Sequence, residues 1–492
     1  MRSATMKIVR SSGILLHPTS LPGRFGIGDL GPECYKFLDF LHGAKQKIWH
    51  VLPLGPTGPE NSPYQSRSSI AGNPLLLSPE KMTDEGYLDK RDLRDSPHFP
   101  AARVNFRAVR RYKLELFRRA FDGFSENAPY RQFAKANAAW LNPFAEFMAL
   151  RTANHEVAWT KFDPTIAASE NEKRFWKFLQ YEFFRQWRQV KEHCAEQEIA
   201  IMGDMPFYVE HDSADVWSSP ELFDLDANGE PRTVGGVPPD YFSRDGQLWG
   251  NPTYNWAELK KRNYAWWVER FRAAFRLVDL LRLDHFRGFV EYWSVPAGHA
   301  TARKGKWVKG PGLDLFNAVQ KKLGTLPLVA ENLGLITHAV EKLRNELSLP
   351  GMVVLQFAFG EEDGTHRPNN YVRNLVSFTG THDNNTTRGW WTELQKAANE
   401  KSGSAAAAEL ERTKIFLQRD GRDISWSFIQ TVMTSVADVS MIPLQDALGL
   451  GSRSRMNIPG RAKGNWRWRF SAGALTPEIA KRLQQLTEVS GR

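Results

Sequence analysis

Cysteine is scarce in this sequence of 492 residues. The two cysteines, Cys34 and Cys194, cannot build a disulfide framework or a cysteine-based metal cluster. No apolar run approaches the roughly 20 residues of a membrane-spanning helix, and the first residues hold too few apolar side chains for the core of a secretory signal. These absences predict a reducing, cytoplasmic setting and argue against a membrane partner.

Motifs for cofactors and metals are also missing. The chain has no glycine-rich phosphate loop, no GxSxG elbow, no Cys–His arrangement for acyl transfer and no metal ligands at the usual spacing. Internal repeats of about 20–50 residues are absent as well. The sequence therefore predicts a protein that needs no cofactor and no metal.

Charge and aromatic content are the two unusual features of the composition. The 65 Lys and Arg residues exceed the 55 Asp and Glu residues by 10, and there are 17 Trp residues. A basic, aromatic-rich protein can bind nucleic acid, but no basic block of the kind found in nucleic-acid-binding tails stands out. Aromatic rings also stack on sugars or fill a large core, and we expect no nucleic-acid partner.

A short apolar run followed by polar, Gly or Pro residues occurs eight times. The runs begin at Gly13, Ile48, Ile199, Val278, Pro327, Met352, Asn374 and Val439. Continuous apolar runs of this length are typical of strands buried on both faces, as in parallel sheets. Helix-like segments such as ITHAVEKLRNEL from Ile336 lie between several of them. Eight such units predict a (β/α)₈ barrel, with a doubly wound sheet as the alternative.

Two of the intervals between runs are too long for a simple strand–helix connection. Residues 65–198 are helix-like and rich in Phe and Trp, whereas residues 210–277 are rich in Gly, Pro and aromatic residues. We interpret residues 1–492 as one catalytic barrel domain with a largely helical insertion at 65–198 and a second insertion at 210–277. Both are expected at the C-terminal face of the barrel, where they would form the walls of a cleft.

Acidic residues come at the end of four of the runs, where a barrel enzyme builds its active site. They are Asp204, Asp284, Glu331 and Asp383. A single Asp after a strand is most often a helix N-cap. Cleavage of a glycosidic bond, however, needs an acid for the leaving oxygen and a carboxylate to stabilise or trap the sugar cation. Four acidic groups in apolar surroundings favour such a site.

The residues next to these carboxylates bear on the role of each one. Arg282 lies two residues before Asp284, so both side chains point to the same side of a strand. The guanidinium would keep the carboxylate ionised, as a nucleophile requires, although a structural ion pair would have the same pattern. Glu331 follows the apolar PLVA, where burial would raise its pKa and suit a general acid. His382, before Asp383, fits a sugar contact and a structural histidine equally well.

Longer motifs carry a family resemblance. LRLDHFRGF, VAENLG and GTHDNN, in this order, resemble the catalytic strands of the α-amylase superfamily. Further motifs resemble the amylomaltase or disproportionating-enzyme family more specifically. They are HPTSLPG, VLPLGPTG, SPYQS, IMGDMPFYV, GGVPPDYFSRDGQLWGNPTYNW and QDALGLGSRSRMNIPG. The resemblance runs from Gly13 to Phe470. It implies a barrel with no separate C-terminal β domain and a retaining 4-α-glucanotransferase. A plain α-glucan hydrolase and a catalytically silent glucan-binding protein are the alternatives.

The same resemblance implies roles for individual residues. Asp284 would be the nucleophile, Glu331 the general acid/base, and Asp383 the carboxylate that binds and distorts the reactive sugar. The residues implied around that sugar are Arg282, His382, Asp204 and Tyr64. Trp249 would cap the acceptor side, in a loop from Gly235 to Trp256. The implied partners are α-1,4-glucans and malto-oligosaccharides, with glucose as an acceptor.

The implied mechanism inverts the anomeric carbon twice, which calls for two carboxyl groups about 5–5.5 Å apart. The chain departs from the family pattern at four positions. Pro59 and Glu60 replace a common aromatic residue and glycine, Asn385 replaces an acidic residue, and His50 replaces Gln. Because none of them is one of the three implied catalytic carboxylates, we expect a changed chain-length preference and retained activity.

Overall fold

The computed structural model describes residues 9–239, 244–360, 364–401, 403–418 and 421–492. Its central sheet has eight parallel strands, and each predicted run overlaps one of them. They are β1 (Ser11–Leu15), β2 (Ile48–His50), β3 (Ala200–Met205), β6 (Leu280–Leu283), β9 (Leu328–Ala330), β10 (Gly351–Val354), β11 (Leu375–Phe378) and β12 (Val439–Pro443).

The sheet closes on itself. Neighbouring strands follow chain order, with β12 paired to β1. The two outermost strands, β9 and β10, are joined by a hydrogen bond from the Ala330 N–H to the Pro350 carbonyl (2.9 Å). Closure removes the unpaired edges of an open sheet. The predicted (β/α)₈ barrel is therefore confirmed, and the doubly wound alternative is excluded.

The barrel strands are apolar because their residues are buried on both sides, under an outer layer of helices. This layer includes α1 (Pro32–Gly43), α9 (Ala265–Leu277), α10 (Leu313–Leu323), α11 (His338–Glu346), α14 (Ile424–Thr434) and α16 (Pro477–Ser490). Between β10 and β11 the described residues contain only short 3-10 turns, η7 (Leu355–Phe357) and η8 (Pro368–Asn370). One of the eight units therefore lacks an α-helix within the described part of the chain.

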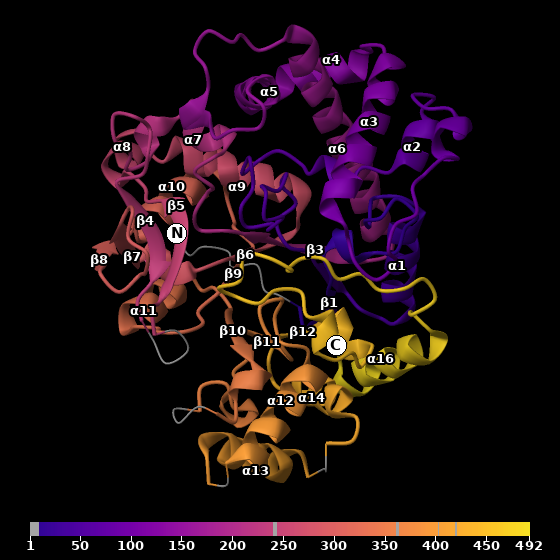
Figure 1. Ribbon diagram of the computed structural model, residues 1–492. Coiled ribbons are helices and arrows are strands. Elements are labelled where there is room, and N and C mark those ends of the chain that lie inside the picture. The colour runs from indigo at the N-terminus through magenta and orange to yellow at the C-terminus, as the bar shows by residue number, and fades with distance from the viewer. Residues whose placement is uncertain (1–8, 240–243, 361–363, 402, 419–420) are drawn as a thin grey trace.

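The long interval between β2 and β3 is helical. It contains α2 (Pro79–Asp84), α3 (Phe106–Asp122), α4 (Ala128–Ala136), α5 (Ala138–Ala153) and α6 (Glu170–Glu196). Figure 1 shows these helices grouped beyond one end of the barrel. The long helix α6 ties the group to the barrel, because the indole N–H of Trp187 donates to the carbonyl of Leu277 at the end of α9 (2.8 Å).

A second, antiparallel sheet was not predicted. Its strands, in the order β5–β4–β7–β8, are β4 (Thr233–Val237), β5 (Gln247–Pro252), β7 (Glu291–Pro296) and β8 (Lys306–Lys309). Short helices α7 (Ala214–Ser218) and α8 (Trp256–Lys261) flank its first two strands in the chain. Because β7 and β8 follow β6, this sheet extends beyond the predicted 210–277 segment. Part of the predicted capping loop, residues 240–243, lies outside the described residues.

The chain after β11 is mainly helical. The remaining helices are α12 (Thr387–Glu400), α13 (Ala405–Leu417) and α15 (Leu444–Ala447). Within the described residues, no strand follows β12, which agrees with the implied absence of a C-terminal β domain. None of the helices in the described part of the chain has the length and apolarity needed to cross a membrane.

Candidate active site

Acidic side chains from four strands meet at the carboxyl end of the barrel. Asp204 belongs to β3, Asp284 and Glu331 directly follow β6 and β9, and Asp383 lies in the loop after β11. Parallel strands carry their carboxyl ends to the same face of a barrel. Residues that are far apart in the sequence are thereby brought to one site.

Arg282 links two of these carboxylates. Its Nη1 donates to both oxygens of Asp204 (2.7 Å each) and to Oδ1 of Asp284 (3.0 Å). Burial opposes the charge of Arg282, but the two carboxylates raise its pKa well above the ordinary value. Burial raises the pKa of Asp284 to about 7, and Arg282 works in the opposite direction by stabilising the ionised form. The guanidinium thus orients Asp284 and favours its charged state.

Glu331 is held by the backbone. Its oxygens accept the N–H groups of His285 (2.8 Å) and Leu333 (2.9 Å). Burial raises the pKa of Glu331 to about 8, while Arg282 lowers it. The sequence predicted an apolar wall for this side chain. In the structure its oxygens meet polar N–H groups, and burial is the cause of the raised pKa.

The turn after Asp284 is strained. His285 adopts a left-handed conformation (φ 51°), which costs a non-glycine residue about 1–2 kcal/mol. The N–H groups of His285 and Phe286 both donate to Glu331, to its side chain (2.8 Å) and its carbonyl (3.2 Å). These hydrogen bonds hold the turn that carries Asp284 against Glu331.

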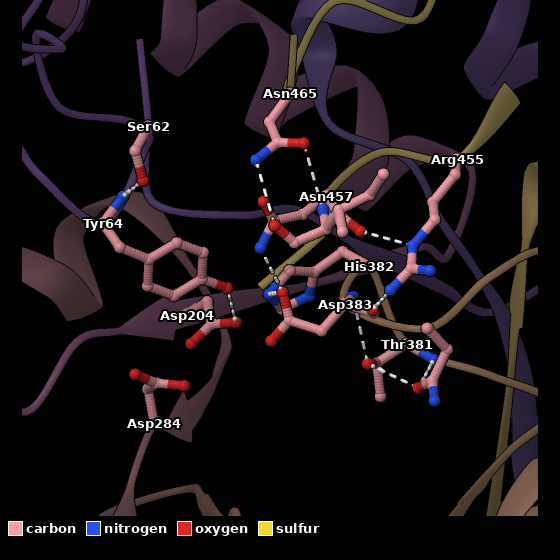
Figure 2. Close-up of polar contacts among 12 residues, drawn as sticks. Ser62, Tyr64, Asp204, Asp284, Thr381, His382, Asp383, Arg455, Asn457 and Asn465 are labelled. Atoms are coloured by element: carbon pink, nitrogen blue, oxygen red, sulfur yellow. Dashed lines mark hydrogen bonds and ion pairs between the residues drawn. The ribbon is translucent and has the colours of Figure 1, made fainter. Parts of the chain in front are cut away.

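Asp383 is fixed by the segment that follows β12. The amide of Asn457 donates to Asp383 Oδ1 (2.6 Å), and Arg455 donates to the Asp383 carbonyl (2.5 Å) and to the Asn457 carbonyl (2.6 Å). Figure 2 shows Asn457 and Arg455 gathered around Asp383, with Asn465 above them in this view. The third carboxylate therefore depends on a part of the chain far from its own loop.

Asp446 braces both ends of the loop that carries Asp383. Its buried carboxylate accepts the hydroxyl of Thr379 (2.6 Å) and both the N–H and the hydroxyl of Thr387 (2.7 Å each). These two threonines flank His382 and Asp383. The loop is thereby anchored to the end of β12.

Tyr64 and His382 form one wall of the site. The Tyr64 hydroxyl donates to Asp204 Oδ2 (2.8 Å), and its ring stacks on His382 (centroids 5.2 Å apart) and contacts Trp466 (5.9 Å). His382 Nε2 lies 3.6 Å from Asp383 Oδ1. Burial lowers the pKa of His382 and so favours the neutral ring.

Trp249 approaches from β5 in the second sheet. Its ring meets the His285 ring edge to face, with centroids 5.0 Å apart, and lies 6.0 Å from Tyr208. This aromatic side chain therefore covers the residue next to Asp284. No other predicted site residue comes from the second sheet.

The positions that depart from the family pattern have different settings. His50 is buried, with Nε2 3.9 Å from Asp204 Oδ2, and burial lowers its pKa. Asn385 donates to the hydroxyl of Ser452 (2.9 Å). Pro59 and Glu60 are exposed at the surface.

The structure brings all eight predicted site residues together and adds others that the sequence did not single out. The added residues are His285, Asp446, Arg455, Asn457 and Trp466. No local pattern marks Asn457 or Asp446, because each acts on a loop about 60 or more residues away in the chain. Within the described residues, no group of three or more His, Cys, Asp or Glu side chains is arranged to hold a metal ion.

Comparisons with known proteins agree with this architecture. The family model described as 4-alpha-glucanotransferase matches residues 16–476. The 4-alpha-glucanotransferase of Synechocystis sp. is 45% identical, with 98% of each chain covered. That of Thermus thermophilus is 42% identical, with 99% of this chain and 100% of the relative covered.

A solved structure extends the match to three dimensions. The amylomaltase from Streptococcus agalactiae in complex with acarbose superposes with a TM-score of 0.92 at 35% identity, covering 98% of this chain and 99% of that one. The family predicted from the motifs is confirmed. The chain belongs to the 4-alpha-glucanotransferase family.

Proposed function

We propose that Asp284 is the nucleophile, Glu331 the general acid/base and Asp383 the group that holds the reactive glucose. The overall reaction is that of a 4-α-glucanotransferase, with retention through a covalent glucosyl–enzyme. The observation that supports the division of roles is the position of Arg282. It hydrogen-bonds Asp284, whereas the hydrogen bonds described for Glu331 come from backbone N–H groups, so the ionised form is favoured at Asp284 and the protonated form at Glu331.

Each half-reaction moves one proton. The Asp284 carboxylate attacks the anomeric carbon, the glycosidic C–O bond breaks, and Glu331 gives its proton to the leaving oxygen. An acceptor 4-hydroxyl then attacks the same carbon, its proton passes to Glu331, and the bond to Asp284 breaks. Two inversions return the original configuration, and no oxidation or cofactor is needed.

Transfer requires a sugar hydroxyl to be delivered in preference to water. Trp249 stands beside His285, next to the proposed nucleophile. We assign the acceptor side to this region, with the 210–277 segment as the insertion that carries it. The helical 65–198 segment is the other proposed wall of the cleft.

The proposed substrates are α-1,4-glucans and malto-oligosaccharides, with glucose as an acceptor. Support comes from the similarity to the S. agalactiae amylomaltase, which was solved in complex with acarbose. Arg282, Asp204, Tyr64 and His382 are proposed to contact the reactive glucose. A cytoplasmic location stays a prediction.

Product analysis with maltotriose tests the reaction. We expect a ladder of shorter and longer oligosaccharides with free glucose and no net gain in reducing ends. A steady gain in reducing ends would identify a hydrolase. If maltotriose were not turned over, the alternative of a catalytically silent glucan-binding protein would be supported.

Two variants test the division of roles. Asp284→Asn is expected to lose activity with every donor. Glu331→Gln should lose transfer from maltotriose but keep formation of the glucosyl–enzyme from α-maltosyl fluoride, because fluoride leaves without a proton. Asp279→Asn, at the opposite end of β6, is the matched control and should remain active. Equal activity of Asp284→Asn and wild type would refute the assignment of Asp284 as the nucleophile.

A further inference from the structure

The excess positive charge of the chain is confined to two segments. Residues 96–114 and 447–477 together hold 11 Lys and Arg residues and no Asp or Glu. The rest of the chain holds 54 basic and 55 acidic residues, which is a balanced composition. Neither segment is a continuous basic block, so the concentration of charge appears only when the two are considered together.

The fold places these segments side by side. Arg103 pairs with Trp468 in an antiparallel bridge, the Val104 N–H donates to the Arg467 carbonyl (2.7 Å), and Arg103 donates to the Arg453 carbonyl (3.2 Å). In Figure 1 the C-terminal segment, in yellow, runs between the barrel strands and the violet helices. The two basic segments are therefore neighbours in the fold.

Six of the basic side chains are exposed, and we call them the basic surface: Arg103, Arg107, Arg111, Arg453, Arg461 and Lys463. Among the residues that the structure describes, none of the six has a carboxylate within ion-pair distance. Glu393 lies at one edge, where Ser452 donates to it (3.3 Å). Like charges gathered without counter-charges destabilise a fold, so folding alone does not account for this surface.

The basic surface borders the proposed active site. Arg461 and Lys463 lie in a loop closed by Asn465, which donates to the carbonyls of Ile458 (3.3 Å) and Arg461 (2.7 Å). Asn457, at the base of this loop, donates to Asp383 (2.6 Å). A glucan held at Asp383 would therefore pass close to the basic surface.

An unmodified glucan is uncharged and offers no partner for these side chains. We propose that the basic surface binds phosphate monoesters carried by the glucan substrate, so that the enzyme prefers phosphorylated α-glucans. A phosphate monoester carries a charge of about −1.5 to −2 near neutral pH. Arginine presents paired donors that match its oxygens. This inference rests on the proposed function, because it places the anion on the substrate of the active site.

Rates with two donors of equal length test the proposal. The probes are maltoheptaose and a maltoheptaose that carries one phosphate monoester. For the wild type we expect kcat/KM to be about tenfold higher with the phosphorylated donor at low ionic strength, the size of one or two charge-assisted contacts. The preference should decline as salt is added.

Charge variants locate the effect. Arg107→Gln/Arg461→Gln/Lys463→Gln should lose the preference and keep the rate with plain maltoheptaose. Lys321→Gln/Lys322→Gln/Lys481→Gln removes the same charge from exposed positions on α10 and α16, and should keep the preference. The single variant Lys463→Gln, in the exposed loop, should weaken the preference if the triple variant does not fold.

Three results would overturn the proposal. They are equal rates with both donors in the wild type, equal loss of preference in the control variant, and inhibition by a single-stranded oligonucleotide at a concentration no higher than the KM for the phosphorylated donor. The last result would identify a nucleic-acid surface. Absence of any turnover of plain maltoheptaose would instead refute the proposed function.

Discussion

Asp446 is the residue through which the Asp383 loop is tied to β12. Its carboxylate receives three hydrogen bonds, from Thr379 and Thr387, in a fully buried position. We predict that Asp446→Ala lowers kcat for maltotriose disproportionation about 10- to 100-fold, because small displacements of a positioned group are costly. Steady-state kinetics with circular dichroism would separate this loss from unfolding.

The conservative variant gives the contrast. In Asp446→Asn the amide oxygen can still accept the Thr387 N–H, and the two hydroxyls can rotate to accept from the amide nitrogen. We expect Asp446→Asn to stay within about fivefold of wild type, in line with a few retained hydrogen bonds. If Asp446→Ala were as active as Asp446→Asn with its fold intact, the bracing role would be refuted.

At the scale of single residues, the sequence predicted contacts between residues that are close together in the chain. Arg282 and Asp284 are two residues apart on one strand, and their contact at 3.0 Å follows from strand geometry. The contact of Asn457 with Asp383 joins two segments through tertiary packing. No periodicity or spacing encodes such a pair. The motif QDALGLGSRSRMNIPG, which carries part of the family resemblance, contains Asn457, but the resemblance implied no role for that residue.

The antiparallel sheet β5–β4–β7–β8 brings Trp249 to the site. Its indole meets the His285 ring at 5.0 Å, beside the proposed nucleophile. We predict that Trp249→Ala raises the share of hydrolysis over transfer, because water gains access and an acceptor sugar loses a stacking surface. Cleavage of the donor should change less, by about threefold or less for the loss of one partly exposed contact.

The measurement is the ratio of new reducing ends to transferred glucose units, taken during the first turnovers with maltotriose. Leu248→Ala is the control, since Leu248 is the next residue on the same strand and is 38% exposed. Neighbouring side chains on a strand point to opposite faces, so its ratio should stay at the wild-type value. An unchanged ratio in Trp249→Ala would exclude a water-excluding role.

The elements differ in how well the sequence predicted them. The eight barrel strands were found because strands buried on both faces are continuous apolar runs. The second sheet was missed, since β4 contains two glycines in TVGGV and β5 contains one in QLWGNP. Glycine lowers strand propensity. Pairing of β7 with β4 is also non-local, and only tertiary contacts specify it.

Across the whole molecule, burial of carboxyl groups sets a pH dependence of stability. Burial raises the pKa of Glu331 to about 8 and that of Asp284 to about 7. It also raises the pKa of Asp215 and Asp446. A raised pKa means that the folded protein binds protons more tightly than the unfolded chain. Each group therefore stabilises the fold below its unfolded pKa and loses that contribution as the pH rises through the folded pKa.

Glu331 offers the clearest test of this linkage. Its ordinary value of 4.5 and its folded value of about 8 define the window in which stability is lost. We predict that Glu331→Gln has a lower Tm than the wild type at pH 4.5, because its amide nitrogen cannot accept one of the two backbone N–H groups that bind Glu331. Above pH 8 the variant should have gained on the order of 1–2 kcal/mol of stability relative to the wild type, because only the wild type must keep a buried charge.

Thermal unfolding of the wild type and of Glu331→Gln, from pH 4.5 to above pH 8, would measure the difference in stability. The control is Glu478→Gln, because Glu478 lies in the first turn of α16 and its hydrogen bond with Thr476 lowers its pKa. That variant should gain no stability at alkaline pH, since its carboxylate favours the folded state when ionised. If Glu331→Gln showed no alkaline gain, burial of Glu331 would not oppose folding. A gain together with lost transfer would mean that the site keeps its acid/base at the expense of the stability of the whole molecule.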